Sequence, residues 1–270
     1  MTMIVLFAPS ASRAAAPPLI TLPDGTYRAV APPHWDGKRK LPLVLYIHGF
    51  RENSAEVMAR DDLVAAVTGL GALFVAPDGM NGGWSHSGAP SHARDDIAFL
   101  HAVVADAEQR YPIDRARVFA AGFSIGGSMV WDLACHGAQG FTAFLPFSGD
   151  FWMPYPTHCE TGPFDLRHTH ADNDHTFPMA GRPLGGGRFH QGNLHDGMEI
   201  LEATDGCAVD PDKESREGDL DCESWSKCSS GKRLELCIHH GDHQIEGVWL
   251  KRSVEWALKR TATKPLFVKD

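Results

Sequence analysis

Short apolar runs alternate with segments of helical periodicity along this chain, and that alternation limits the fold more than any other feature. Strand-like runs occur at 25–31, 41–49, 72–77, 117–123, 141–149, 164–171 and 233–240. Helix-like segments occur at 94–111, after residue 123 and at 244–259. Strands separated by helices pair in parallel, because a parallel pair needs a crossover connection. The sequence therefore predicts an α/β fold with an open, mainly parallel sheet covered by helices on both faces.

A serine lies between two glycines where the strand at 117–123 passes into a helix, in the stretch "GFSIG". Such an elbow turns too tightly for side chains beside the serine, so Gly122 and Gly126 let the backbone close and raise the hydroxyl above the sheet. The following helix points its N-terminal amides at the same place, which favours negative charge there. Ser124 is therefore the predicted nucleophile. The alternative is a small-residue turn that only packs the helix on the strand.

A serine hydroxyl needs a base at neutral pH, and three histidines close to the end of the last strand are candidates. His243 follows Gly241 by two residues, near the start of the last helix, and is the predicted base. His239 and His240 lie within the strand or at its end, where we expect them to point into the faces of the sheet.

The base in turn needs a carboxylate that fixes its tautomer and stabilises the imidazolium. Asp172 and Asp174 both follow the strand at 164–171, and both precede His243. The order serine, aspartate, histidine is the one found in α/β-hydrolases. Position alone leaves both aspartates open as the third member of a triad.

Two backbone amides are predicted to form an oxyanion hole. Gly49 ends the strand at 41–49 and allows a close backbone approach, so the amide of Phe50 can point at the site. The amide of Ile125, directly after the serine, is the second predicted donor.

The six cysteines are even in number and form no C-x-x-C pair, which favours disulfides over a zinc ribbon. The stretch "CESWSKCSSGKRLELC" predicts a hairpin that turns near Ser229–Gly231 and places Cys222 opposite Cys237. The other four can then pair as Cys207–Cys228 and Cys135–Cys159. Free buried thiols are the alternative.

Size and charge narrow the class further. The chain has 270 residues, 43% of them hydrophobic, and a formal net charge of -9. This size suits one large α/β domain, predicted at 17–270. No basic stripe is present, so neither nucleic acid nor an anionic membrane is a predicted partner. Residues 1–16 resemble the end of a secretory signal or a disordered tail, and with the cysteines they predict a secreted or periplasmic protein.

Several of these motifs together resemble a known group, the secreted α/β-hydrolase esterases of the polyhydroxybutyrate depolymerase and feruloyl esterase type. The resemblance runs from about residue 40 to 258. It is carried by "LYIHGF", "APDGMNGGWSHS", "DDIAFL", "YPIDRARVFAAGFSIGGSMVWDLAC", "HTHADNDHTFP", "DGC" and "GDHQIEGVW". It implies the α/β-hydrolase fold and a serine esterase that acts on a carboxylic ester without a cofactor or metal.

The resemblance also assigns individual residues. The acid of the family lies four residues before a proline, which selects Asp174 over Asp172. Relatives commonly join the "DGC" cysteine to the cysteine before the last strand, in agreement with Cys207–Cys228. Trp84 matches a tryptophan that often lines the cleft, and a core or surface aromatic is its alternative. Feruloyl, acetyl-xylan, hydroxyalkanoate and synthetic polyester substrates all suit the resemblance.

One residue departs from the family pattern, in which two glycines precede the histidine. Here Asp242 replaces the second glycine. If its side chain faces the site, it favours the imidazolium of His243. The alternative, which we favour, is that Asp242 caps the final helix.

Other functions are also consistent with the sequence. The cluster His168, His170, Asp172, Asp174 and His175 has nitrogen and oxygen ligands at a spacing that suits a divalent ion. A metal-dependent hydrolase would use that cluster and leave Ser124 structural. An acyltransferase would pass the same acyl-enzyme to an alcohol, and a non-catalytic binding protein would use the scaffold alone.

Overall fold

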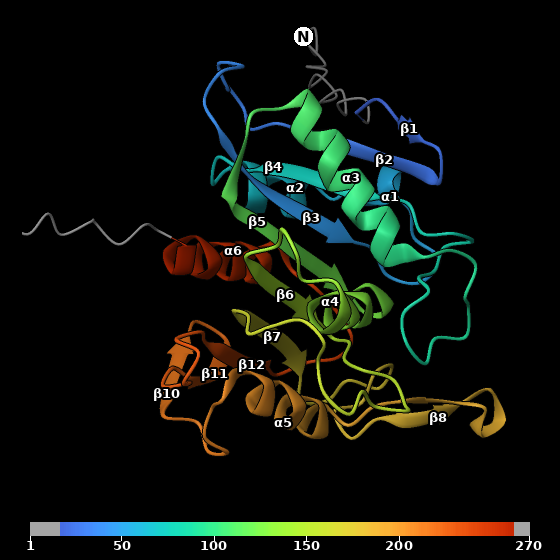
Figure 1. Cartoon of the computed structure of the whole chain (residues 1–270), viewed down its shortest axis with the longest axis vertical. Coiled ribbons are helices and arrows are strands. Elements are labelled where there is room, and N and C mark those ends of the chain that lie inside the picture. The colour runs from blue at the N-terminus through green and yellow to red at the C-terminus, as the bar shows by residue number, and fades with distance from the viewer. Residues whose placement is uncertain (1–16, 262–270) are drawn as a thin grey trace, which may run out of the picture.

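The computed structural model describes residues 17–261, and ten of its twelve strands form one sheet (Figure 1). In spatial order the strands are β1 (Ile20–Leu22), β2 (Gly25–Val30), β4 (Leu73–Pro77), β3 (Leu41–Ile47), β5 (Ile113–Phe123), β6 (Ala143–Phe147), β7 (Leu166–Ala171), β12 (Leu234–His239), β11 (Leu220–Trp225) and β10 (Lys213–Glu217). The six strands from β4 to β12 pair in parallel, and the outer ones pair antiparallel. The predicted, mainly parallel sheet is confirmed.

Helices cover both faces of this sheet (Figure 1). They are α1 (Ser54–Met58), α2 (Asp61–Thr68), α3 (Asp96–Arg110), α4 (Ile125–His136), α5 (Leu194–Asp205) and α6 (Gly247–Thr261). Helices α3, α4 and α5 contribute to one hydrophobic core, and α1, α2 and α6 contribute to the other. Successive side chains of β5 alternate between the two, with Val118 and Ala120 in the first core and Phe119 and Ala121 in the second.

Several elements are additional to those predicted from the sequence. They are α1, α2, α5, β1, β10 and a small hairpin of β8 (Arg182–Leu184) and β9 (Phe189–Gln191), which a short 3-10 turn at Gly185–Gly187 connects. The buried residues of α5 include Leu194, Met198 and Leu201, whose spacing of four and three residues places them on one helical face. That pattern is legible in the sequence, and the helix was predictable from it.

The three expected disulfides are present: Cys135–Cys159, Cys207–Cys228 and Cys222–Cys237. Cys222 and Cys237 lie directly opposite each other on the antiparallel strands β11 and β12, as the predicted hairpin required. The signal-like segment 1–16 lies outside the described residues. Within residues 17–261, none of the helices combines the length and apolar character needed to span a bilayer.

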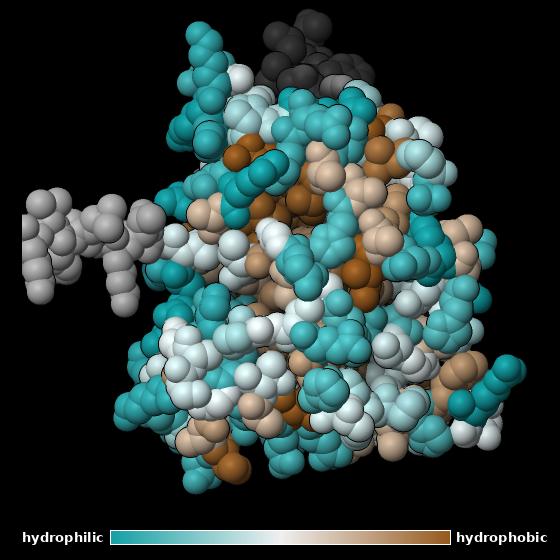
Figure 2. Space-filling model, viewed as in Figure 1, coloured by the Kyte–Doolittle hydropathy of each residue, from teal (hydrophilic) through white to brown (hydrophobic). Residues whose placement is uncertain are grey.

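Hydrophilic residues cover much of the face shown in Figure 2, and hydrophobic ones form separate groups between them. The large hydrophobic residues exposed among the described ones include Phe50, Met80 and Met153. Phe50 bears on the predicted oxyanion hole, because it follows β3 at the carboxyl edge of the parallel strands.

One buried carboxyl group makes the fold sensitive to pH. Asp205 ends α5 and is 1% exposed. Its Oδ1 accepts a hydrogen bond from the Phe164 amide at 3.2 Å, but its Oδ2 has no hydrogen-bond partner among residues 17–261. Burial raises the pKa of Asp205 to about 7, and the nearby Asp165 carboxylate adds to the rise. Ionisation of Asp205 therefore opposes folding.

We predict that Cys222→Ala/Cys237→Ala lowers the free energy of unfolding by about 2–4 kcal/mol, because the bond closes a chain segment in the unfolded state. Urea unfolding of the oxidised protein measures this change. An unfolding curve equal to that of the parent protein would contradict the prediction.

We also predict that Asp205→Asn stabilises the protein more at high pH. Because the pKa of Asp205 is raised in the folded state, the folded protein loses stability as the pH rises from about 4, the pKa in the unfolded state, to about 7. Asparagine keeps an acceptor for the Phe164 amide and carries no charge. Thermal or urea unfolding should show a gain about 2 kcal/mol larger at pH 8 than at pH 5. Equal gains at both pH values would contradict it.

Candidate active site

Ser124 occupies a strained turn between β5 and α4, with φ 58° and ψ -123°. A positive φ is costly for a residue with a side chain, and it persists here because the neighbouring backbone is tightly packed. A Cβ atom on Gly126 would collide with the carbonyl oxygens of Ile47 and His48, and one on Gly122 would collide with the Gly126 carbonyl. Glycine is therefore required at both positions, as the sequence predicted.

The structure brings Ser124, His243 and Asp174 together in one hydrogen-bonded line. His243 Nε2 lies 2.8 Å from Ser124 Oγ, and His243 Nδ1 lies 2.7 Å from Asp174 Oδ2. A carboxylate can only accept, so Nδ1 carries the proton and Nε2 presents its lone pair to the serine hydroxyl. Ser124 follows β5, Asp174 follows β7 and His243 follows β12, so the three meet at the carboxyl ends of parallel strands.

The Asp174 side chain is fully buried and is held on both oxygens. Its Oδ1 accepts hydrogen bonds from the amides of Thr176 at 2.8 Å and Phe177 at 2.6 Å. Burial alone would raise the pKa of Asp174, but the hydrogen bonds from His243 and the Phe177 amide outweigh it and hold the pKa below its usual value. Asp174 is therefore ionised at neutral pH, as a partner for an imidazolium must be.

The rival residues lie elsewhere. Asp172 is partly exposed and pairs with Nδ1 of the exposed His240 at 2.5 Å. The ring of His239 is buried and stacks on Trp249, with 4.0 Å between ring centroids. None of these three residues hydrogen-bonds to Ser124 or Asp174.

The loop after β3 is fixed from several sides. Nδ1 of His48 donates to the Gly49 carbonyl at 2.7 Å, and the Gly79 amide donates to its Nε2 at 2.9 Å. Glu52 accepts a hydrogen bond from the Gly49 amide at 2.8 Å. These bonds hold the turn that carries the next amide, that of Phe50. His48 and Glu52 were not predicted as part of the site, although both lie within the "HGFRE" stretch.

The amides of Phe50 and Ile125 are the two predicted oxyanion donors. Among residues 17–261, neither amide donates a hydrogen bond to another residue. Ile125 is the first residue of α4, where backbone amides have no partner inside the helix. Both amides are therefore unpaired among the described residues, as the donors of an oxyanion hole must be before substrate binds.

Trp84 does not line the cleft, and the prediction that it binds substrate is wrong. Its side chain is 0% exposed, and its Nε1 donates to the His48 carbonyl at 2.9 Å. The ring also packs against the His48 ring, with 4.9 Å between centroids. Trp84 supports the backbone of the loop that carries Phe50, which is a structural role.

Asp242 neither caps the final helix nor bonds to the imidazole of His243. Helix α6 begins at Gly247, five residues later, so the predicted cap is wrong. Asp242 Oδ1 accepts hydrogen bonds from the amides of His175 at 2.9 Å and His243 at 2.7 Å. These backbone bonds lower the pKa of the exposed Asp242 carboxyl. The side chain joins the loop that follows β7 to the loop that carries His243.

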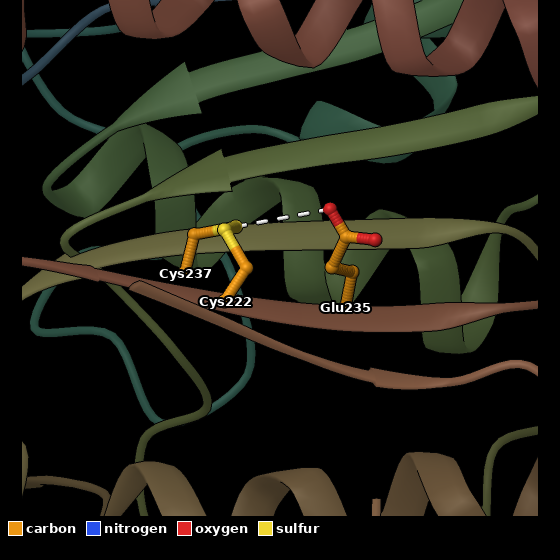
Figure 3. Close-up of side chains that lie close together, drawn as sticks. All are labelled: Cys222, Glu235 and Cys237. Atoms are coloured by element: carbon orange, nitrogen blue, oxygen red, sulfur yellow. Dashed lines mark hydrogen bonds between the residues drawn. A yellow bond between two sulfur atoms is a disulfide. The ribbon is translucent and has the colours of Figure 1, made fainter. Parts of the chain in front are cut away.

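The proposed metal cluster is not assembled. His168 and His170 are buried and hydrogen-bonded to each other at 2.9 Å. Asp172 instead pairs with His240, and His175 pairs with Asp242; both partners lie in the loop that follows β12. Within residues 17–261, the side chains grouped closely enough for a metal are Cys222, Glu235 and Cys237 (Figure 3).

The two sulfur atoms of that group are joined in a disulfide, and Glu235 lies 2.7 Å from the guanidinium of the buried Arg167. The oxidised group therefore offers no thiolate ligand, and its carboxylate is already neutralised.

A cavity of about 230 Å³ borders His243. Phe123 lines it and packs on the His243 ring, with 4.7 Å between centroids. The polar side chains that line it include Glu52, Arg60 and Gln244.

No family model matches the chain. The chain is 29% identical over 171 residues to a probable feruloyl esterase C of Aspergillus clavatus, and the aligned region covers 60% of this chain and 59% of the relative. The chain is 28% identical over 200 residues to feruloyl esterase D of Neurospora crassa, and that alignment covers 73% of this chain and 62% of the relative. The chain thus spans about three fifths of the length of these curated relatives.

Among solved structures, an acetyl xylan esterase from Aspergillus awamori superposes with a TM-score of 0.64 at 14% identity, over 88% of this chain and 94% of that one. The chain has the α/β-hydrolase fold. The resemblance to feruloyl esterases that the sequence motifs indicated is confirmed by these homologues. Ser124, Asp174 and His243 also follow one another along the chain in the order of an α/β-hydrolase triad.

We predict that Asp174→Asn lowers kcat for ester hydrolysis by about 10⁴-fold, as loss of the buried triad carboxylate does in serine proteases. Asp172→Asn is the matched control, because it makes the same change two residues away on an exposed side chain. We expect it to change kcat by less than about threefold. Steady-state kinetics on p-nitrophenyl acetate measures both, and a larger loss in the Asp172 variant would reverse the assignment.

Proposed function

We propose that this protein is a serine esterase that hydrolyses carboxylic esters through an acyl-enzyme on Ser124. The observation that carries the proposal is the continuous line from Asp174 Oδ2 through both nitrogens of His243 to Ser124 Oγ, at 2.7 and 2.8 Å. The curated relatives named as feruloyl esterases agree with it.

The proposed reaction begins with proton transfer from the Ser124 hydroxyl to His243 Nε2 as the oxygen attacks the ester carbonyl carbon. The carbonyl oxygen becomes an oxyanion and accepts hydrogen bonds from the amides of Phe50 and Ile125. The imidazolium, stabilised by Asp174, then gives its proton to the leaving alkoxide. The acyl group remains on Ser124.

The second half repeats these steps with water. His243 takes a proton from a water molecule whose oxygen attacks the acyl carbon, and the second tetrahedral oxyanion forms at the same two amides. His243 then returns the proton to Ser124 Oγ as the carboxylic acid leaves. The water-derived proton and hydroxyl balance the overall hydrolysis.

We infer that the substrate is an ester that joins an aromatic acid or acetic acid to a sugar hydroxyl. The names of the relatives, feruloyl esterase and acetyl xylan esterase, favour these acyl groups. The alcohol must leave beside His243, and the polar cavity there suits a hydroxylated group. Methyl ferulate, p-nitrophenyl acetate and hydroxybutyrate oligomers form the test panel. Faster turnover of the hydroxybutyrate oligomers would contradict this substrate class.

We further infer that the protein works outside the reducing cytosol, with residues 17–270 as its catalytic domain. Six cysteines form three disulfides, which persist in oxidising compartments. Non-reducing peptide mapping of the exported protein tests this inference, and free thiols would contradict it.

We predict that Ser124→Ala lowers ester turnover to within about 10³–10⁴-fold of the uncatalysed rate while the fold survives. Ser229→Ala is the control, because Ser229 is exposed and lies before β12, at the opposite end of that strand from His243. Hydrolysis of p-nitrophenyl acetate and the far-UV circular dichroism spectrum measure activity and fold. A Ser124 variant that keeps a tenth of the parent activity would overturn the nucleophile assignment.

A further inference from the structure

A line of buried ring nitrogens runs from α4 through β7 to the loop of Asp174. Trp131 Nε1 lies 3.1 Å from His168 Nδ1, and His168 Nε2 lies 2.9 Å from His170 Nδ1. His170 Nε2 lies 2.8 Å from the carbonyl oxygen of Phe177. All three rings are 0% exposed, so protein atoms alone satisfy these nitrogens.

The hydrogen bonds in this line can run in only one direction. The indole nitrogen of Trp131 only donates, so His168 Nδ1 must accept. A neutral imidazole then carries its proton on Nε2, and His168 donates to His170 Nδ1. The second ring is fixed in the same way, and His170 Nε2 donates to the Phe177 carbonyl, which can only accept.

This geometry makes both histidines neutral in a single tautomer. A second proton on His170 Nδ1 would meet the Nε2 proton of His168. Burial has the same effect, because it lowers the pKa of His170 to about 4 and lowers the pKa of His168 well below its usual value. The nearby Asp174 carboxylate opposes this shift in His170 without overcoming it.

The line ends on the residue that holds the triad acid. The carbonyl of Phe177 accepts from His170, while the amide of the same residue donates to Asp174 Oδ1 at 2.6 Å. His170 Nε2 also lies 3.7 Å from Asp174 Oδ2, the oxygen that faces His243. The protonated edge of the ring therefore fixes the turn from Asp174 to Phe177 and favours a negative charge on the acid.

We propose that the chain Trp131–His168–His170 is a positioning device for Asp174, with His170 as the positioning residue that contacts the acid's turn. The inference rests on the proposed esterase function. The positioning device adds three buried side chains, one on α4 and two on β7, to the residues that form the site. It also accounts for two histidines on β7 that the triad does not use.

The competing explanation is that the two rings only fill the core. A core role depends on volume and burial, whereas positioning depends on the donor that faces Phe177. His170→Gln and His170→Leu separate the two, because the terminal amide of glutamine can place a donor near the former Nε2 position and leucine cannot.

His239 supplies a matched control on the neighbouring strand. It is 1% exposed, lies beside Ala171 in the β7–β12 register and stacks on Trp249. His239→Leu therefore makes the same chemical change at a comparable depth without touching the turn that holds Asp174.

We expect His170→Leu to lower kcat by about 10–100-fold with KM within about twofold, the size of effect seen when an outer partner of a site is removed. His170→Gln should recover most of kcat, and His239→Leu should keep it within about threefold. Equal losses in the glutamine and leucine variants, or in the His239 control, would overturn the proposal. If His170→Leu does not fold, Trp131→Phe, which removes the first donor, must lower kcat without raising KM.

A double variant tests whether His170 acts through the acid. In an Asp174→Asn background, His170→Leu should cause little further loss of kcat, because the partner it positions is already disabled. A loss equal to that in the parent background would overturn the proposal.

Amide hydrogen exchange gives a readout that does not need activity. His170→Leu should speed exchange at the Thr176 and Phe177 amides, and His239→Leu should not. Unchanged exchange at both amides overturns the positioning role even if the protein is an esterase. Faster exchange in a protein that hydrolyses no ester would overturn the proposed function and leave the structural part of the inference standing.

Discussion

The site depends on the parallel alignment of the central strands. Because β3, β5, β7 and β12 run in the same direction, the segments that leave their carboxyl ends meet at one edge of the sheet. Those segments carry Phe50, Ser124, Asp174 and His243. Packing is tight at the elbow, where α4 approaches β3 so closely that Gly126 has no room for a Cβ atom. The strained backbone of Ser124 is a consequence of that approach.

The loops at this edge are held by hydrogen bonds of fixed direction. His48, in its single neutral tautomer, bridges Gly49 and Gly79. Asp242 joins the acid loop to the histidine loop through two backbone amides. Buried or shared groups of this kind cost free energy when they lose a partner, so each favours one loop conformation over its alternatives. A preorganised site of this kind needs little rearrangement when charge develops on a bound ester.

The part of the sheet beyond β12 is stabilised differently. The strands β11 and β10 extend it antiparallel, and the Cys222–Cys237 disulfide joins β11 to β12 across a directly opposed pair. Arg167 of β7 is buried there and pairs with Glu235 of β12 and Glu217 of β10. A buried guanidinium with two carboxylate partners, beside a covalent bond, fixes the strand that precedes His243.

The sequence by itself determined the succession of strands and helices along the chain, the glycine elbow that carries the predicted nucleophile, and the hairpin that pairs Cys222 with Cys237. These features follow from local periodicity and local backbone limits. It left Asp172 and Asp174 undecided by spacing, and a family pattern was needed to choose between them. It also misassigned Trp84 and Asp242. Tertiary structure decided these cases, because the direction of a side chain after a strand depends on what packs against it. The line from Trp131 to His170 likewise joins a helix to a strand 37 residues away, so no local pattern could indicate it.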